Sequence, residues 1–308
     1  MQVNQKRQIL IYSLVFTIMV LWGINIVILK VLVTELPPAT MTAFRVMLAG
    51  ITTMTILILS RSIRKMTGYE WKYMLLGMVF GVILHHALLA ISLTMIEASN
   101  AALILALVPL TTAVMAVIFL GEKLTPARIL GILIALAGVF FIQGESFKNF
   151  NFSLGEILIF ISMLTQALSF IFIKKVTMTL SPTQTTAMMF LTGSIGLVIV
   201  SFIVEPGGIS KMFSAEPYVY LLFVLSGIIV TGFGYIVYNS AIKEIGAGQT
   251  VIFNNFVPFF GVIFSMIFLN ETISSSQIAG FVLVVIGVLI GTGYIELMWR
   301  KRNRKNDF

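Results

Sequence analysis

Ten apolar segments fill almost the whole sequence and restrict what it can fold into. We place them at residues 9–33, 40–60, 71–93, 99–120, 127–143, 154–173, 183–204, 218–241, 250–269 and 277–298. An apolar run of about 18 residues or more is long enough to cross a bilayer as an α-helix. Only 10% of the residues are charged and 58% are hydrophobic, whereas a soluble domain has about 25% charged residues. The sequence therefore predicts an all-α polytopic membrane protein with ten transmembrane helices.

The connections and the amino-acid usage exclude several other classes. The connections are short and contain residues that end helices, such as Pro37-Pro38 and Pro206-Gly207-Gly208. The first apolar segment is too long for the core of a signal peptide, and no small-residue cleavage site follows it, so we expect it to remain as the first span. There is no cysteine, which excludes disulfides and cysteine-based zinc, redox or nucleophile chemistry.

Most of the lysines and arginines outside the apolar segments fall on one side of the predicted membrane. With a cytoplasmic N-terminus, only Lys148 and Lys211 among them lie in outer segments. Cytoplasmic loops carry an excess of lysine and arginine, so this distribution predicts a multi-pass plasma-membrane protein with both termini in the cytoplasm. It also explains the net charge of +8 without a nucleic-acid partner.

The stretch Ile96–Gln143 aligns without a gap with Ile245–Thr292. The alignment places Pro109 on Pro258, Glu122 on Glu271, Gly131 on Gly280 and Gly138 on Gly287. Each half contains five segments, an odd number, so the second copy must cross the membrane in the opposite direction. We therefore predict two inverted five-helix repeats, at residues 9–143 and 154–293, followed by a basic cytoplasmic tail at 294–308. Secondary transporters commonly have this architecture, with the site near the midplane.

Motifs in both halves make the chain similar to a known family. They are Trp22-Gly23-Ile24-Asn25, Lys30 and Phe44-Arg45, together with the duplicated proline, the leucine and glutamate after it, and the two glycines. The chain resembles the drug/metabolite transporter (DMT) superfamily, EamA type, over about residues 9–293. This resemblance implies ten helices, a central cavity between the halves, and transport of small organic solutes, often amino acids or other metabolites and often outward. The second half departs from the pattern at Asn270 and Met189, which argues against a symmetric set of ligands.

Pro109 and Pro258 lie inside apolar segments. Each removes a backbone hydrogen bond, and we expect this to free the carbonyl groups of Leu105 and Asn254. Such groups are tolerated in a bilayer only where protein or a water-filled cavity can satisfy them. We interpret both prolines as hinges or kinks that line the translocation path; the alternative is a kink that serves packing alone.

His85 and His86 are the only histidines. Adjacent residues on a helix point about 100° apart, so one can face the cavity while the other faces a neighbouring helix. An ionisable residue within a membrane is a functional candidate, and histidine changes charge near neutral pH. The hypothesis is that at least one contacts substrate or carries a coupling proton; the alternative is that both serve packing. Two adjacent histidines without cysteine or a nearby acid make a poor metal site, so no metal is predicted.

The other charged residues give weaker signals. No aspartate or glutamate lies in the middle of an apolar segment, so coupling through a buried carboxylate is not expected. We interpret Glu122 and Glu271 as boundary residues that cap a helix or reach the interface. Lys30 and Arg45 lie near the outer ends of their segments, and our first interpretation is that their charged heads also reach the interface. The alternative is a fixed positive charge that faces the outer cavity and suits a solute with a carboxylate.

Polar and aromatic side chains gather on the segments expected around the cavity. The predicted substrate-binding or translocation residues are His85, His86, Trp22, Asn25, Asn100, Gln166, Ser169, Tyr235, Tyr238, Asn254 and Asn255. Amides and rings together suit a partly apolar organic solute that also forms hydrogen bonds. The alternative for many of them is that they join helices to one another.

These observations predict a secondary transporter of small organic metabolites, such as amino acids or related solutes, that works as an exporter by alternating access. Its partners would be the solute, the lipid bilayer and, as a candidate, a coupling proton, with no cofactor. One alternative is a multidrug or cation exporter of the same fold, although that would favour an acidic cavity. A polytopic enzyme or a channel is less favoured, because no catalytic set of residues is visible.

Overall fold

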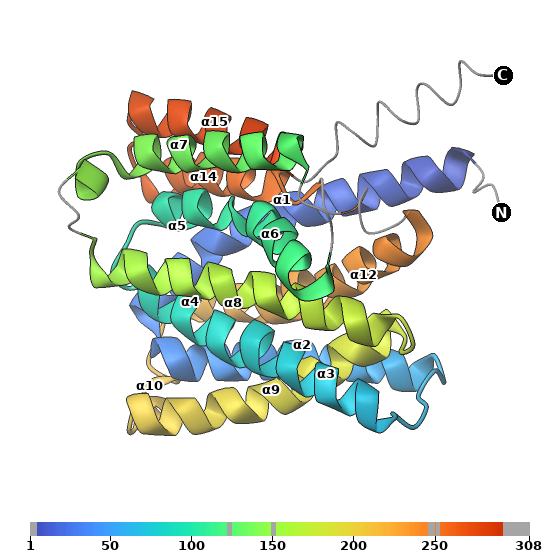
Figure 1. Cartoon of the computed structure of the whole chain (residues 1–308). Coiled ribbons are helices and arrows are strands. Elements are labelled where there is room, and N and C mark those ends of the chain that lie inside the picture. The colour runs from blue at the N-terminus through green and yellow to red at the C-terminus, as the bar shows by residue number, and fades with distance from the viewer. Residues whose placement is uncertain (1–4, 122–124, 149–151, 246–249, 251–252, 292–308) are drawn as a thin grey trace, which may run out of the picture.

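The computed structural model describes residues 5–121, 125–148, 152–245, 250 and 253–291, and these residues are almost entirely helical (Figure 1). The helices of the first half are α1 (Gln5–Glu35), α2 (Pro38–Leu59), α3 (Gly68–Met78), the π-helix η1 (Val79–Leu84), α4 (His85–Leu93), α5 (Ala98–Leu105), α6 (Val108–Leu120) and α7 (Pro126–Lys148). Those of the second half are α8 (Leu154–Thr177), α9 (Pro182–Val204), α10 (Gly208–Lys211), α11 (Pro217–Val224), the π-helix η2 (Leu225–Phe233), α12 (Gly234–Ile245), α14 (Phe256–Leu269) and α15 (Ser275–Gly291).

Each of the ten predicted segments overlaps helix. Seven helical stretches are long and apolar enough to cross a membrane, and Ile129–Ile142, Phe256–Leu269 and Ser275–Gly291 are shorter apolar helices. Large apolar side chains cover the outside of the bundle; Ile118, for example, is 68% exposed. In water such a surface would be unfavourable, whereas hydrocarbon is its natural solvent. The prediction of an all-α polytopic membrane protein is therefore confirmed.

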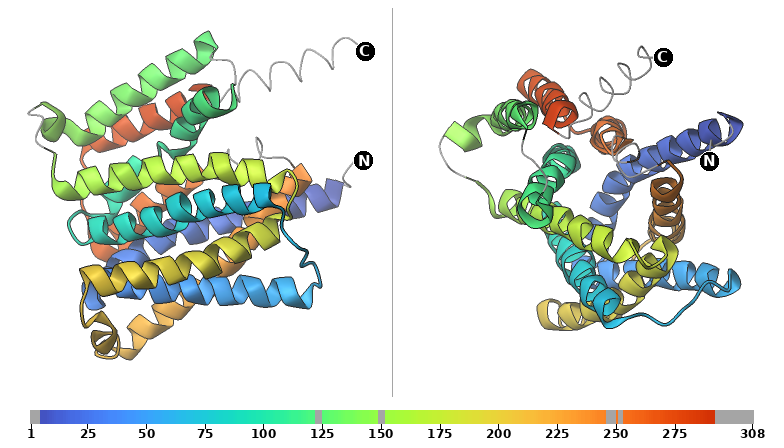
Figure 2. Two further views of the ribbon diagram at one scale, coloured as in Figure 1. Left: turned by 60° about the horizontal axis from the view of Figure 1, so that its bottom comes forward. Right: turned by 45° about the vertical axis from the view of Figure 1, so that its right-hand side comes forward.

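The helices pair across the two halves as an inverted repeat requires. Since α1 corresponds to α8 and α6 to α14, a contact between α1 and α14 needs a counterpart between α8 and α6, and both contacts are present. Two further pairs, α2 with α9 and α7 with α15, join helices that correspond to each other. Figures 1 and 2 show these two pairs on opposite sides of the bundle. The inverted arrangement expected from the repeated sequence is thus found in the structure.

The glycines shared by the two repeats lie where α7 crosses α15. A β-carbon built at Gly138 would lie 2.6 Å from the carbonyl oxygen of Gly280, and one built at Gly287 would lie 2.6 Å from that of Gly131. The repeat alignment places Gly131 on Gly280 and Gly138 on Gly287, so each of these two contacts is the counterpart of the other. Small residues allow helix backbones to approach closely in a membrane. The duplicated glycines therefore form a two-fold symmetric crossing of backbone against backbone.

The two prolines lie in the first turns of α6 and α14, just after interruptions of their apolar segments. Pro109 lies in the first turn of α6, after a break from α5 at Ala106-Leu107. Pro258 lies in the first turn of α14, where a missing N–H costs little because that group has no partner within the helix. The prediction that the carbonyl group of Asn254 is free is wrong. Its oxygen accepts a hydrogen bond from the Val257 N–H at 3.1 Å.

Two glutamate side chains cap helix N-termini at the end of the bundle that carries α10, which is at the left of Figure 1. Glu271 accepts hydrogen bonds from the backbone N–H groups of Ala98 and Ser99, both at 2.8 Å, at the start of α5. Glu205 accepts from the N–H groups of Ala39 and Thr40 at 2.9 and 2.8 Å, at the start of α2. A carboxylate at a helix N-terminus is stabilised by the unpaired N–H groups and the helix dipole. The interpretation of Glu271 as a capping residue is confirmed, and Glu122 lies outside the described residues.

Lys30 is held at the same end and does not extend freely to the interface as we first interpreted it. Its Nζ donates to the carbonyl oxygens of Leu93 and Ile96, both at 2.7 Å. Leu93 is the last residue of α4, and a positive charge is favourable beside the unpaired carbonyl groups at a helix C-terminus. Lys30 therefore ties α1 to the end of α4.

Removing the cap on α5 should lower stability. The change Glu271→Ala leaves two N–H groups of Ala98 and Ser99 without their acceptor, so we expect a loss of about 1–3 kcal/mol. Thermal unfolding of the purified protein in detergent measures it. Glu216→Ala is the matched control, because Glu216 also precedes a helix but is exposed and makes no capping hydrogen bond. Equal melting temperatures for the two variants would contradict the capping role.

Candidate substrate site

Arg45 is buried in the interior of the bundle, contrary to our first interpretation that its head reaches the interface. It lies seven residues after the start of α2, which corresponds to a depth of about 10 Å along the helix. Its relative exposure is 1%, because α2 is enclosed by α9, η2 and α4. A guanidinium group stays charged in proteins. The structure therefore holds a fixed positive charge in the middle of the helices.

Hydroxyl groups from the second half surround this arginine. Nη1 of Arg45 donates to Oγ1 of Thr231 at 2.9 Å and contacts Oγ of Ser226 at 3.5 Å. The Ser226 hydroxyl in turn donates to Oδ1 of Asn25 at 2.6 Å. Nη2 of Arg45 lies 3.5 Å from Nδ1 of His86. Arg45, Asn25 and His86 belong to the first half and both hydroxyls to the second, so this polar network lies between the halves.

The π-helices explain how these groups reach one another. In an α-helix, residues five apart point about 140° away from each other. In a π-helix, backbone hydrogen bonds join residues i and i+5, so Ser226 and Thr231 of η2 point to nearly the same side. The equivalent segment of the first half, η1, directly precedes His85 and His86. Short π-helical segments occur frequently at functional sites.

Aromatic side chains form a second part of the centre. Trp22 donates from Nε1 to the carbonyl oxygen of Val230 at 3.0 Å. Its ring centroid lies 5.0 Å from that of Tyr235 and 5.1 Å from that of Tyr238. The hydroxyl of Tyr238 accepts a hydrogen bond from Nδ2 of Asn254 at 2.9 Å. The tryptophan and the two tyrosines thus make an amphipathic wall with hydrogen-bonding groups at its edges.

Gln166 joins the aromatic wall to the arginine. Its side chain lies beside the hydroxyl of Tyr235, and Tyr235 lies close enough to interact electrostatically with Arg45. We call the whole set the central cluster: Trp22, Asn25, Arg45, His86, Gln166, Ser226, Thr231, Tyr235, Tyr238 and Asn254. It draws on both halves and on most of the helices around the centre.

Four buried atoms of the central cluster have no hydrogen-bond partner among the described residues. They are two nitrogens, Nε of Arg45 and Nε2 of His86, and two amide oxygens, Oε1 of Gln166 and Oδ1 of Asn254. Buried polar groups are almost always paired, since leaving one unpaired costs about 1–3 kcal/mol. Unpaired donors and acceptors in one buried region are what a binding site for a polar solute requires.

The two histidines have different surroundings. Nδ1 of His85 lies 2.9 Å from Oγ and 3.2 Å from the carbonyl oxygen of Ser162, so His85 joins α4 to α8. His86 contacts Arg45 and belongs to the central cluster. The sequence-based expectation that adjacent histidines face different surroundings agrees with this geometry. Among the described residues, no three His, Asp or Glu side chains come together closely enough to hold a metal ion.

Besides His85, three other predicted residues lie outside the central cluster. Oδ1 of Asn100 accepts from Nε2 of Gln277 at 2.9 Å, which links α5 to the first turn of α15. Ser169 packs against η1, where a β-carbon built at Gly81 would lie 2.6 Å from its Cβ. Asn255 lines an apolar cavity of about 530 Å³ between α14 and α15. The first two therefore join helices, as the alternative interpretation of the polar residues expected.

Sequence reasoning missed Ser226 and Thr231. Both are hydroxyl residues within an apolar segment, each directly followed by glycine, which was the available signal. Their common direction depends on the π-helix, and no local sequence pattern predicts it.

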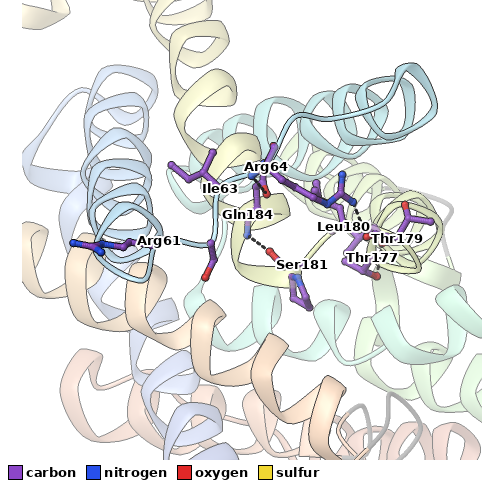
Figure 3. A pocket seen from close by; sticks show the side chains of 11 residues that line it. Arg61, Ile63, Arg64, Thr177, Thr179, Leu180, Ser181 and Gln184 are labelled. Atoms are coloured by element: carbon purple, nitrogen blue, oxygen red, sulfur yellow. Dashed lines mark hydrogen bonds between the residues drawn. The ribbon is translucent and has the colours of Figure 1, made fainter.

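A cavity of about 760 Å³ lies at the end of the bundle opposite α10 (Figure 3). It is formed by the α2–α3 connection and by the ends of α8 and α9, with Arg61, Arg64, Thr177 and Gln184 in its lining. Nε2 of Gln184 donates to the carbonyl oxygen of Arg64 at 2.7 Å, so the two halves are also joined here. The side chains of the central cluster do not line this cavity.

The fold and the buried polar centre define a polytopic membrane protein of the inverted-repeat transporter class. The model of the EamA-like transporter family matches residues 9–144 and 153–292, and the chain belongs to this family.

Curated relatives and a solved structure agree with this assignment. The uncharacterized transporter YyaM of Bacillus subtilis is 30% identical over 294 residues, covering 93% of this chain and 95% of the relative. The WAT1-related protein At3g02690, chloroplastic, of Arabidopsis thaliana is 23% identical over 87% of this chain and 66% of that protein. A crystal structure of a protein with 19% sequence identity has a TM-score of 0.66 and covers 93% of this chain and 97% of that one, which shows the same fold.

Proposed function

We propose that this membrane transporter is a secondary exporter of small organic metabolites, such as amino acids or related solutes, and works by alternating access. The observation that carries the proposal is the central cluster, which is buried between the halves and has unpaired donors and acceptors. The repeats at residues 9–143 and 154–293 would move against each other around it, with the tail at 294–308 in the cytoplasm. The distribution of basic residues supports a plasma-membrane orientation with the α10 end outside.

Flux measurements with purified protein in proteoliposomes test this proposal. We expect saturable, competable flux of at least one solute from a panel of amino acids and related metabolites. The variant Trp22→Ala, which removes the central ring of the aromatic wall, should reduce that flux about tenfold or more. Tyr218→Ala is the control, because Tyr218 is exposed. A conductance that does not saturate would indicate a channel and contradict the proposal.

The candidate coupling proton belongs on His86, which contacts Arg45 and lies 4.9 Å, ring to ring, from His85. Within the described part of the chain, Arg45 and His85 are the charged or titratable groups that contact it. We expect His86→Gln to change the dependence of flux on pH, because an imidazole can gain or lose a proton and an amide cannot. His85→Gln should keep the pH profile, since His85 is bound to Ser162. If the double variant transports as the native protein does at every pH, the proton is not carried by histidine.

A further inference from the structure

The charge of Arg45 is not balanced by any described residue. Arg7 pairs with Glu244 and Arg64 with Glu70, and both ion pairs lie near helix ends, away from Arg45. The groups in contact with the guanidinium are the hydroxyls of Thr231 and Ser226 and the imidazole of His86, and the phenol of Tyr235 lies nearby. An ion alone inside a membrane is expensive and usually marks a pathway or a counter-ion site. An anion is therefore the missing component of this site.

The guanidinium presents one free edge to such an anion. Nη1 is used by Thr231, whereas Nε has no partner and Nη2 has only the 3.5 Å contact with His86. Two parallel N–H groups, such as those of Nε and Nη2, match the two oxygens of a carboxylate. If the Nδ1 of His86 accepts from Arg45, its proton lies on Nε2, which is also an unpaired buried donor.

The rest of the central cluster limits what else the solute can carry. The cluster also contains the rings of Trp22, Tyr235 and Tyr238, so the remainder of the solute meets the aromatic wall, which has hydrogen-bonding groups at its edges. A phosphate dianion would need a second cation, and Arg45 is the only lysine or arginine of the cluster. A cation would be repelled by Arg45, which argues against the alternative of a cation exporter.

We propose that the transported solute carries a carboxylate, which binds to the Nε–Nη2 edge of Arg45, while its apolar part lies against Trp22 and the two tyrosines. This inference rests on the proposed transport function, because it names the chemical class of the solute. Arg45 would then recognise one negative charge at the interface of the halves.

Matched pairs of small acids and amides test the inference: acetate with acetamide, 3-methylbutyrate with 3-methylbutyramide, and 3-phenylpropionate with 3-phenylpropionamide. Melting temperatures of the purified protein in detergent should rise with at least one acid and with none of the amides. In Arg45→Met the apparent affinity for that acid should fall at least about 30-fold. Arg45→Lys should show an intermediate response, because it keeps the charge but loses the paired N–H groups.

The stability of Arg45→Met without solute separates recognition from a structural role. Replacing a buried charge by an apolar side chain of similar length is often neutral or stabilising, so we expect a melting temperature equal to or above that of the native protein. A lower melting temperature with an unchanged response to acids would overturn the inference. So would equal responses to acids and amides, a response to no acid, or a stronger response to inorganic phosphate.

Flux in proteoliposomes distinguishes this inference from the function on which it rests. Saturable flux of a solute without a carboxylate, at the same rate in Arg45→Met, would overturn the inference and leave the transport function intact. Acid binding that depends on Arg45, without saturable flux of any solute, would support the carboxylate site and overturn the proposed transport.

Discussion

Leucine in place of Gly138 should prevent α7 and α15 from packing and should leave little folded protein. A β-carbon at this position would lie 2.6 Å from the carbonyl oxygen of Gly280 and 2.7 Å from the backbone nitrogen of Val284. These neighbours are backbone atoms, which cannot rotate away as a side chain can. Overpacking of a core with flexible neighbours costs about 1–3 kcal/mol, and we expect a larger loss here. The yield of monodisperse protein after detergent extraction measures the effect.

The two-fold relation between the repeats sharpens this test. Gly287→Leu should be as damaging as Gly138→Leu, because the corresponding β-carbon would lie 2.6 Å from the carbonyl oxygen of Gly131. Gly68→Ala is the control, since a β-carbon at Gly68, in the first turn of α3, meets no atom within 4 Å. Normal yields and melting temperatures for both leucine variants would mean that α7 and α15 do not cross this closely.

A disulfide across the α10 end should stop transport completely and reversibly. A β-carbon built at Gly208 would lie 3.3 Å from Cβ of Thr40, close to the separation of about 3.5–4.5 Å found in disulfides. Thr40 lies in the first turn of α2, in the first half, and Gly208 follows α9 in the second half. If the halves must separate at this end in each cycle, the variant Thr40→Cys/Gly208→Cys should lose flux when oxidised and recover it when reduced.

The native chain suits this experiment because it contains no cysteine that could react instead. The two single-cysteine variants should transport equally under oxidising and reducing conditions. Mass spectrometry establishes that the cross-link has formed in the oxidised double variant. Flux at the native rate through cross-linked protein would show that this end need not open and would contradict alternating access between the halves.

The helices and their inverted duplication could be predicted because both depend on local properties of the chain. Run length and apolarity determine where a helix can span a membrane, and the odd number of segments per half determines the direction of the second copy. The crossing of α7 with α15 was not predicted, although the shared glycines are a signal for it, because glycine leaves room for backbone contact. Pro109 was less informative, because a proline inside an apolar run fits both a kink and the first turn of a new helix.

The charged residues illustrate where sequence reasoning stopped. Lys30 and Arg45 lie at similar distances from the ends of their predicted segments and received the same interpretation. In the structure Lys30 binds the carbonyl groups of Leu93, at the end of α4, and of Ile96, whereas Arg45 of α2 is enclosed by α9, η2 and α4. Position along a helix gives depth, but it does not say whether lipid or another helix lies opposite the side chain.

The sequence by itself determined the all-α membrane class of the fold and its inverted duplication, and it supplied most of the polar residues of the candidate site. Only the tertiary structure decided which of them meet: Asn25, His86 and Gln166 join the arginine, while Asn100 and Ser169 link helices. The physical reason is that helix formation in a bilayer is a local requirement of the backbone. A binding site depends on contacts between residues far apart in the chain, and here a π-helix also turns Ser226 and Thr231 toward Arg45.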